Sequence, residues 1–461
     1  MHYFNNMSMK HSKKYGVLSK GLIYFQLFTL ALWAFSPLAK NMNAQKISEK
    51  KTLTLSSAIK RTLEHNPQLK VFDFRQVALS GEQQTGALRP VYEMGFEMEN
   101  FSGTGDVGTF ETTEYTLSLS SILEMGDKRD ARLSVVKGRK SQLNAKRKVA
   151  ALNLLSEVTR RYIDVIAAQE RLSLAKQASV LAEDTLAEVE KRAKAGVAPE
   201  AEVKRALAAL GNARLIASSE LQQFQYTKIA LAMMWNETTP SFAQVEGDLY
   251  QFSADIEFET LYAKVKQNPE ILIYAAEERL RDAQLRLART ESSANIKWSV
   301  GIKQIQDIND TALTAGFSMP LFSSKRNTGA IISAQAKRDE IVVKRAATML
   351  HLHNQLYRAY ANRKQAIFTA NSLKDSIIPT LKDALNEIQI AYQRGLYSYL
   401  DYLSVRQELL FAQRAMIEAA SSALRYGTEI EQLIAEPLPA SQYGLTPVFN
   451  EQLNQELNET F

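Results

Sequence analysis

Residues 92–99 read YEMGFEME, a stretch in which apolar side chains alternate with glutamate or glycine. On an extended chain successive side chains point to opposite faces, so the apolar side chains share one face. Glu93, Glu97 and Glu99 share the other. A helix of 3.6 residues per turn would scatter both sets around its circumference. The stretch therefore predicts a β-strand with one apolar and one acidic face.

Three more segments alternate in the same way, and short polar or glycine-rich linkers join the four strands into two hairpins. In the second hairpin Lys297 and Lys303 lie on the face opposite Trp298. Strands of about 10 residues cross a bilayer when they are tilted, and membrane barrels carry aromatic residues on the lipid face. The expected strands span about residues 91–101, 113–123, 295–304 and 311–320.

Two interpretations of these hairpins are open: a soluble antiparallel sheet with one buried face, and a membrane sheet. Four strands do not close a barrel, and lipid does not tolerate an open sheet edge. Closure in a membrane must come from other copies, and three copies supply twelve strands. In that arrangement the polar face becomes the barrel lumen, where simple wetting is the ordinary role of polar residues. The candidate lumen residues are Glu93, Glu97, Glu99, Lys297 and Lys303.

Between the strands the sequence favours helices much longer than the three or four turns of an ordinary globular helix. Gly196 interrupts the first helical pair and Gly395 the second. Such helices need a bundle or coiled coil, and the segment from Leu172 to Val189 places small and apolar residues three and four apart. The expected helices span about residues 137–194, 200–235, 330–394 and 398–434.

The chain repeats itself at a spacing of about 200 residues. Asn66-Pro67 recurs as Asn268-Pro269, Lys128-Arg129 as Lys325-Arg326, and Gly196 as Gly395. Anchors in one order at one spacing indicate a tandem duplication. The expected organisation is a first repeat over residues 45–240, a second over 241–435, and a polar tail over 436–461.

The first 44 residues have the pattern of a secretory signal peptide. Lysines precede the apolar run 21–35, and Ala44-Gln45 suits cleavage. Removing this segment removes five lysines and no acid, so the net charge falls from +6 to +1. That balance argues against a nucleic-acid partner. After the leader no apolar run reaches the length of a membrane-spanning helix.

Neither a metal site nor catalysis is expected. The chain has no cysteine, and His351 and His353 are two residues apart on a helix, where they cannot share a metal ion. His65 lies beside the proline break, with no second histidine near it in sequence. Glycine-rich phosphate loops and nucleophile motifs are missing as well. We expect no cofactor and no enzymatic activity.

The combination of leader, two repeats, hairpins and glycine-broken helices resembles the TolC-type outer-membrane efflux family over residues 53–434. The similarity rests on LSSA at residues 55–58 leading into Asn66-Pro67, on LEMGDKR at 123–129, and on the helix entry after Gly395. Residues 97–105 together with 123–129 resemble the CzcC-like heavy-metal cation efflux branch.

This resemblance implies a mainly α fold with a membrane β-barrel: a homotrimeric, twelve-stranded barrel in outer-membrane lipid above a twelve-helix periplasmic tunnel. It implies a passive exit duct that receives substrate from an inner-membrane resistance-nodulation-division pump through a periplasmic adaptor. Gly196 and Gly395 would mark the helix tips where the adaptor docks. The resemblance also implies a gate at Leu400, Asp401 and Ser404, although Ser404 stands where some relatives carry aspartate.

Simpler roles exist for the same residues. Asp401 has the simpler role of a solvated acid at the start of a helix, where it interacts favourably with the helix dipole. Leu400 has the simpler role of a core residue. Lys128-Arg129 and Lys325-Arg326 would either hold lipid phosphates or pair locally. The alternative function is a periplasmic coiled-coil scaffold whose sheet is soluble. Such a protein would have to cover the apolar stripe of Met94, Phe96, Trp298 and Phe317.

Overall fold

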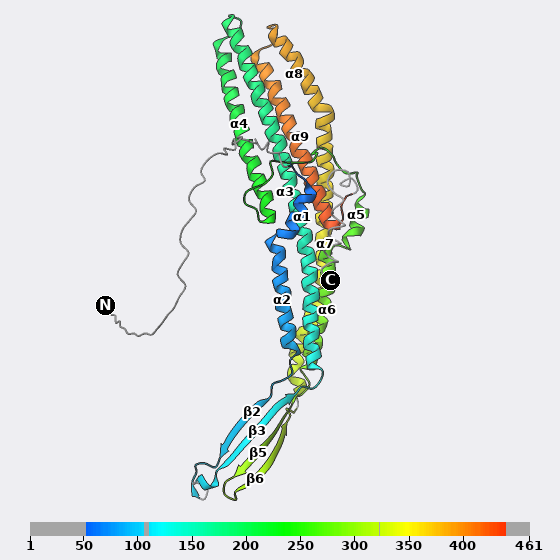
Figure 1. Ribbon diagram of the computed structural model, residues 1–461. Helices are drawn as coiled ribbons and strands as arrows, with labels where there is room; N and C mark the ends of the chain where they lie inside the picture. Colours follow the sequence, from blue (N-terminus) through cyan, green and yellow to red (C-terminus); the bar gives the residue numbers. More distant parts are fainter. Residues whose placement is uncertain (1–51, 106–109, 322, 439–461) are drawn as a thin grey trace, which may run out of the picture. The chain divides into compact units, whose positions relative to one another are not determined.

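The computed structural model describes residues 52–105, 110–321 and 323–438 (Figure 1). The expected signal peptide, residues 1–44, lies outside the described residues. So does most of the expected tail, from residue 439 onward.

Both Asn-Pro pairs separate a short helix from a longer one. Asn66 ends α1 (Leu55–His65) with extended backbone angles (φ −68°, ψ 125°) and precedes α2 (Pro67–Ala87). Asn268 stands in the same way between α5 (Phe258–Val265) and α6 (Pro269–Thr290). Proline disfavours the helical conformation in the residue before it and suits the first helical turn. The pair therefore breaks the chain into two helices at one point in each repeat.

The four alternating segments form one antiparallel sheet in the order β2-β3-β5-β6. Its central pair, β3 and β5, joins the hairpin of the first repeat to that of the second. β2 stops before Asn100 and β6 starts after Asn309, because both asparagines take left-handed angles (φ 55° and 57°) that end regular strand geometry. The strands are β2 (Glu93–Glu99), β3 (Glu114–Leu123), β5 (Ile296–Ile305) and β6 (Asp310–Ser318). A separate parallel pair joins β1 (Thr52–Leu53) to β4 (Gln244–Val245).

The first long helix begins earlier than the sequence suggested. α3 spans Lys128–Lys194 rather than starting at residue 137, and it runs straight through Gly138. A Cβ at Gly138 would lie 3.0 Å from the Cα of Leu280 in α6, so this glycine permits close helix packing and does not mark a helix end. Its partner α4 (Glu200–Ala232) continues into a short 3₁₀ turn, Met233–Trp235.

The expected helix over 330–394 is interrupted. The chain forms α7 (Thr328–Ser372), a π turn over Leu373–Ile377, and then α8 (Ile378–Gln393). Pro379, in the first turn of α8, explains the break because proline has no N–H to donate to the preceding turn and its ring clashes with that turn's carbonyl. After Gly395, α9 (Tyr399–Ile434) returns along α7 and α8.

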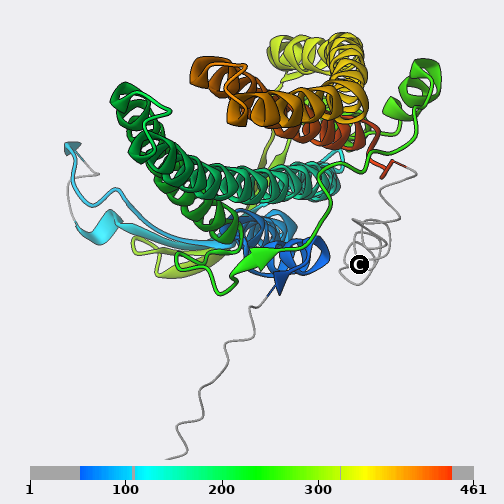
Figure 2. The same cartoon turned by 90° about the horizontal axis from the view of Figure 1, so that it is seen from above.

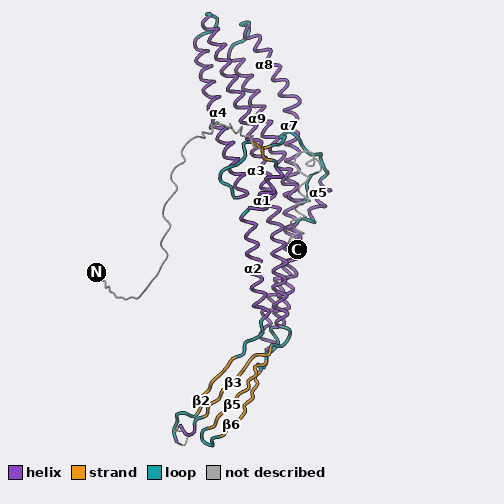
Figure 3. The backbone as a smooth tube through the Cα atoms, in the orientation of Figure 1, coloured by secondary structure: helices purple, strands orange, loops and turns teal. Residues whose placement is uncertain are grey.

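The helices pack side by side around α3, which contacts α4 and α9, and also α2 and α6 (Figure 2). The expected seam on α3 is largely buried, with Ala182 and Val189 almost fully enclosed. The sheet continues from the ends of α2, α3, α6 and α7, and the glycine tips lie at the opposite ends of the long helices (Figure 3). Across the described residues, every helix is too short or too polar to cross a membrane.

Candidate channel wall and gate

One face of the four-stranded sheet is an exposed apolar surface. Met94 is 80% exposed, Phe96 68% and Phe317 84%, and no described element covers them. Tyr92 and Trp298 meet edge to face on the same side, with ring centroids 6.2 Å apart. A contiguous apolar patch of this kind marks an interaction with lipid or another protein. Three members of the expected stripe, Met94, Phe96 and Phe317, are thus uncovered within the described chain, and Trp298 is half-buried.

The opposite face gathers every candidate lumen residue. The strand register aligns Glu97 with Thr116, and Thr116 with Lys303, so these side chains share the polar face. Lys297 lies 3.5 Å from Glu93, and Lys303 lies 2.8 Å from Glu99.

Lys303 also pairs with Glu114, a polar-face residue that the sequence analysis left out of the candidate set. Glu114 lies two residues before Thr116 in β3, so the two side chains point to the same face of the sheet. The alternation of the sequence is therefore enough to identify Glu114 as a polar-face residue. Lys297 and Lys303 of β5 therefore reach carboxylates of β2 across β3, and Lys303 also meets one on β3 itself.

The two outer strands of the sheet, β2 and β6, run in opposite directions, and each has one edge that is unpaired in the described chain. β2 runs away from the helices and β6 runs back toward them, and neither outer edge is paired within the described residues. A β2 edge and a β6 edge of separate copies would meet antiparallel. Edges of this kind invite pairing with another chain.

Gly196 and Gly395 build the same turn at the two helix tips. Both have left-handed angles (φ 76° and 77°), the region that favours glycine. Val197 N–H donates to the Arg192 carbonyl at 3.0 Å, and Leu396 N–H donates to the Ala391 carbonyl at 2.9 Å. Each turn thus satisfies carbonyls at the end of its helix and reverses the chain.

Tyr392 of α8 ties the two tips together. Its hydroxyl donates to a carboxylate oxygen of Glu202 in α4 at 3.1 Å. The Arg192 guanidinium of α3 lies 4.5 Å from the Tyr392 ring centroid and donates to the Gln393 carbonyl at 3.0 Å. Burial, with the Glu202 hydrogen bond second, raises the pKa of Tyr392 to about 12. The phenol is therefore a neutral donor at physiological pH.

Two more tyrosines of α9 complete this cluster. Tyr402 stacks on Tyr392 at 5.9 Å between centroids, and Tyr399 lies 6.1 Å from Tyr392. The Tyr399 hydroxyl is buried without a hydrogen-bond partner in the described chain. An unsatisfied buried hydroxyl destabilises the packing that encloses it.

Arg406, one turn further along α9, is 5% exposed. It donates to the Thr185 hydroxyl at 3.0 Å and to the Ala178 carbonyl at 3.1 Å, both on α3. It forms no ion pair with any described residue, and burial lowers its pKa. A buried cation held only by neutral acceptors makes the contact between α9 and α3 less stable than an apolar contact would be. The sequence analysis missed Arg406, because a lone arginine on a helix gives no sign of what packs against it.

The three candidate gate residues lie in the first turns of α9, where Leu400 is exposed. Asp401 is engaged in a capping box: its carboxylate accepts from Ser398 Oγ at 2.6 Å and from Ser398 N–H at 3.1 Å. These bonds lower the pKa of Asp401. Ser404 contacts Glu408 at 3.3 Å within its own helix. In the structure Asp401 therefore caps the start of a helix, which is the simpler of the two roles that its sequence position allows.

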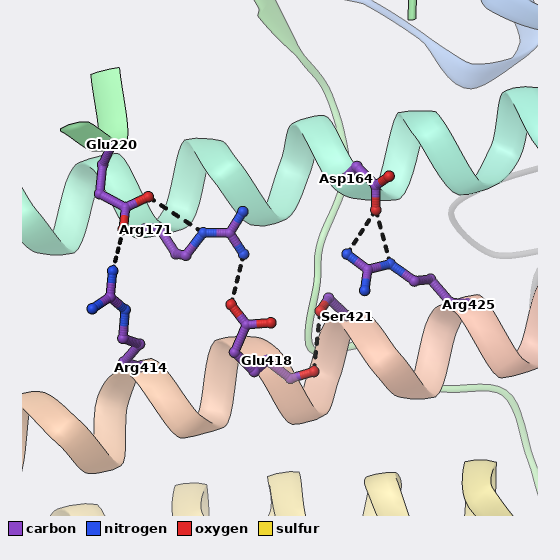
Figure 4. Close-up of polar contacts among 7 residues, drawn as sticks. All are labelled: Asp164, Arg171, Glu220, Arg414, Glu418, Ser421 and Arg425. Atoms are coloured by element: carbon purple, nitrogen blue, oxygen red, sulfur yellow. Dashed lines mark hydrogen bonds and ion pairs between the residues drawn. The ribbon is translucent and has the colours of Figure 1, made fainter. Parts of the chain in front are cut away.

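Further from the tips, charged side chains link α3, α4 and α9 (Figure 4). Glu220 of α4 pairs with Arg414 of α9, and it lies 3.4 Å from Arg171 of α3. Arg171 also pairs with Glu418 at 2.7 Å, and Asp164 pairs with Arg425 at 2.7 Å. This network fixes the register of the three helices below the tyrosine cluster.

Within the part of the chain that the structure describes, no group of three or more histidine or acidic residues is arranged to hold a metal ion. His353 packs edge to face against Tyr262 and Phe258, which is a packing role.

An apolar sheet face, a polar sheet face, and long helix pairs in two repeats define a class of protein, the outer-membrane channel subunit with a helical extension. A sequence model of outer membrane efflux proteins matches residues 58–237 and again residues 261–436, so the chain belongs to the outer membrane efflux protein family. The second match agrees with the duplication expected from the sequence.

The chain is 23% identical over 323 residues to the cobalt-zinc-cadmium resistance protein CzcC of Cupriavidus metallidurans, which covers 70% of this chain and 77% of that protein. The solved structure of CusC matches with a TM-score of 0.69 at 15% identity, covering 83% of this chain and 92% of the other. The CmeC outer membrane channel of Campylobacter jejuni matches with a TM-score of 0.67 at 16% identity, over 87% and 89%.

These findings confirm the expected resemblance and the expected fold class. The chain is an outer-membrane efflux channel protein that extends into the periplasm.

Proposed function

We propose that three copies of this chain form a passive exit duct. The β6 edge of one copy pairs antiparallel with the β2 edge of the next, which closes a twelve-stranded barrel and removes every open edge. The observation that carries the proposal is the uncovered apolar sheet face with Met94, Phe96 and Phe317, because lipid is the surrounding that such a face requires.

In this assembly Glu93, Glu97, Glu99, Lys297 and Lys303 line the lumen, since they lie on the face opposite the apolar one. Cross-strand pairing of both lysines supports a lining that wets the pore. Selection among substrates then belongs to the pump that feeds the duct.

The helix tips at Gly196 and Gly395 are the docking region for a periplasmic adaptor, which connects the duct to an inner-membrane resistance-nodulation-division pump. Exposed apolar residues at both turns, Val197 and Leu396, support a protein contact there. The duct has no energy-coupling step and no catalysis of its own.

Opening separates the α8–α9 tip from the α3–α4 tip in the manner of an iris. Closure depends on the Tyr392–Glu202 bond and on the Arg192 contact, which join the two tips. The π turn at Leu373–Ile377 interrupts one helix of the moving pair, while α3 is continuous, and π turns inside helices are frequent at functional sites. The poorly compensated Arg406 favours a contact that can be exchanged.

Heavy-metal cations are the proposed substrate class, on the strength of the similarity to CzcC. A drug-like substrate is the alternative. A metal-binding site in the duct itself is unnecessary for this role, because a channel conducts best when it binds its cargo weakly.

The deciding experiment is single-channel conductance of the purified oligomer in a planar bilayer, together with its mass. A trimer with discrete conductance supports the duct. A water-soluble species without conductance would instead support the periplasmic scaffold.

A covalent cross-link between the two helix tips tests whether the duct opens by their separation. The chain has no cysteine, so Ala195→Cys with Arg394→Cys introduces a unique thiol pair at the two tips. Joining these thiols with a short bifunctional maleimide should abolish export and leave trimer formation intact. Undiminished export in the joined form would overturn the iris.

A further inference from the structure

Each of the four junctions between strand and helix carries exposed basic residues. They are Arg89 before β2, Arg129 after β3, Arg289 before β5, and Lys325 with Arg326 after β6. Because the strands form two hairpins, all four junctions lie at the same end of the sheet (Figure 1). We name these five residues the junction belt.

Lys128, the first residue of α3, is not a member. It is buried and donates to the Asn295 side chain at 2.8 Å, with Glu291 at 3.8 Å. Its neighbour Arg129 is exposed and donates through Nε to the Ala87 carbonyl at 2.7 Å, which holds α3 against the end of α2. The two basic pairs found in the sequence therefore differ: Lys128 has an internal partner, whereas Lys325 and Arg326 are both exposed.

The cations of the junction belt outnumber the carboxylates around them, although Glu124 is close enough to Arg129 to interact with its charge. None of its members forms an ion pair with a described residue, whereas the two junction glutamates are already engaged. Glu124 binds Arg132 through both carboxylate oxygens, and Glu291 faces Lys128. The remaining junction acids are Asp127 and Asp130, so five cations without an ion pair exceed two such carboxylates at this end.

The far end of the same sheet has the opposite sign. Its acids include Glu99, Glu111, Glu114, Asp307 and Asp310, and Lys303 is its one lysine or arginine among the described residues. Charges scattered for solubility alone would not sort by sign between the two ends of one sheet.

Exposed apolar residues adjoin the belt on its strand side. Val91 and Tyr92 follow Arg89 on the way into β2, and Leu321 stands between β6 and Lys325. An apolar surface that changes to cations at its border matches a leaflet, where acyl chains give way to phosphate.

We propose that the junction belt binds anionic phospholipid headgroups of the leaflet that faces the periplasm. The inference rests on the proposed membrane insertion of the sheet. Guanidinium and ammonium groups bind phosphate oxygens, and a ring of three chains presents fifteen such cations at one level of the membrane. Bound lipid anchors the depth of the barrel and stiffens the junctions from which the helices extend.

The test is native mass spectrometry of the trimer from nanodiscs that contain equal amounts of phosphatidylglycerol and phosphatidylcholine. Wild-type protein should retain at least about fivefold more phosphatidylglycerol than phosphatidylcholine. The double variant Lys325→Gln/Arg326→Gln should lose at least half of this enrichment. Lys337→Gln/Arg345→Gln removes the same charge from exposed positions further along α7 and should retain it.

Equal retention of the two lipids by wild type, or equal loss in both variants, would overturn the proposal. Displacement of phosphatidylglycerol by millimolar inorganic phosphate would also overturn it, since that result indicates a site for free phosphate. Conductance measured in pure phosphatidylcholine separates the proposed channel function from the proposed lipid binding. A trimer that conducts but shows no lipid preference would support the channel and overturn lipid binding by the junction belt. Mass and conductance of each variant exclude misfolding as the cause.

Discussion

Asn66 and Asn268 make equivalent contacts 202 positions apart in the two repeats. Asn66 Oδ1 accepts from Gln68 N–H at 2.8 Å, while its Nδ2 donates to the Met234 carbonyl at 2.7 Å. Asn268 accepts from Glu270 N–H at 2.7 Å and donates to the Leu433 carbonyl at 2.8 Å. Each asparagine thus starts one helix and satisfies a terminal carbonyl at the end of the long helix of its own repeat.

Replacing either asparagine by alanine should destabilise the helical part of the protein. Asn66→Ala removes a cap and leaves a buried carbonyl unpaired, which we expect to lower the free energy of unfolding by about 2 kcal/mol. Asn268→Ala should lower it by about 3 kcal/mol, because Asn268 also donates to the Gln432 carbonyl. Denaturant unfolding followed by helical circular dichroism measures both. Exposed Asn212 in α4 provides the control, since Asn212→Ala should leave stability unchanged or slightly raised.

Glycine is required at the tips by backbone conformation alone. A Cβ at Gly196 or Gly395 would meet no atom within 4 Å, yet both residues have positive φ. Each Gly→Ala change should therefore lower the free energy of unfolding by about 1 kcal/mol through strain. Gly81, inside α2 with equally open space and an ordinary helical backbone, should respond in the opposite direction to Gly81→Ala. Loss of stability at Gly81 would show that space, and not conformation, governs these sites.

Much of the sheet was readable from sequence because alternation is a local property. Alternate residues of a strand point to opposite faces, so the residues on each face of β2 and β5 can be predicted from their positions in sequence. Gly395 can likewise be predicted to end a helix. Contacts between distant segments were not readable: nothing beside Tyr392 in the sequence indicates Glu202. Two local signals were overlooked. Pro379 should have divided the helix over 330–394, and Ser398 three residues before Asp401 is the pattern of a capping box.

Tyr392→Phe should favour the open duct. The variant keeps the ring and its packing but removes the hydroxyl that donates to Glu202, so the closed state loses one contact between the tips. We expect a several-fold rise in open probability in planar bilayers. Glu202→Gln leaves an acceptor for the phenol and should behave more like wild type. An unchanged open probability in Tyr392→Phe would exclude this bond as part of the closure.

Alkaline pH tests the same contact without mutation. The pKa of Tyr392 is raised from 10 to about 12, so the folded protein holds this proton more tightly than the unfolded chain. Its contribution to stability is complete below pH 10 and is lost as the pH rises toward 12. Burial also raises the pKa of Tyr250 to about 12, so ultraviolet titration of the phenolates should show one tyrosine fewer titrating in this range in Tyr392→Phe than in wild type. Open probability should also rise with pH in this window, and a flat profile would count against the contact.

Asp401 has two roles to separate, a helix cap and a ring of carboxylates in the trimer. Its pKa is lowered by the Ser398 hydrogen bonds, so it stays charged at neutral pH and the cap weakens only as acid protonates it. Asp401→Asn keeps an acceptor for Ser398 and removes the charge, whereas Ser398→Ala removes the cap and keeps the charge. If three carboxylates form a ring, Asp401→Asn alone should reduce the preference for cations, measured as the reversal potential in a salt gradient. If Asp401 only caps α9, Ser398→Ala should destabilise the helix start more than Asp401→Asn does, and both variants should leave the reversal potential unchanged.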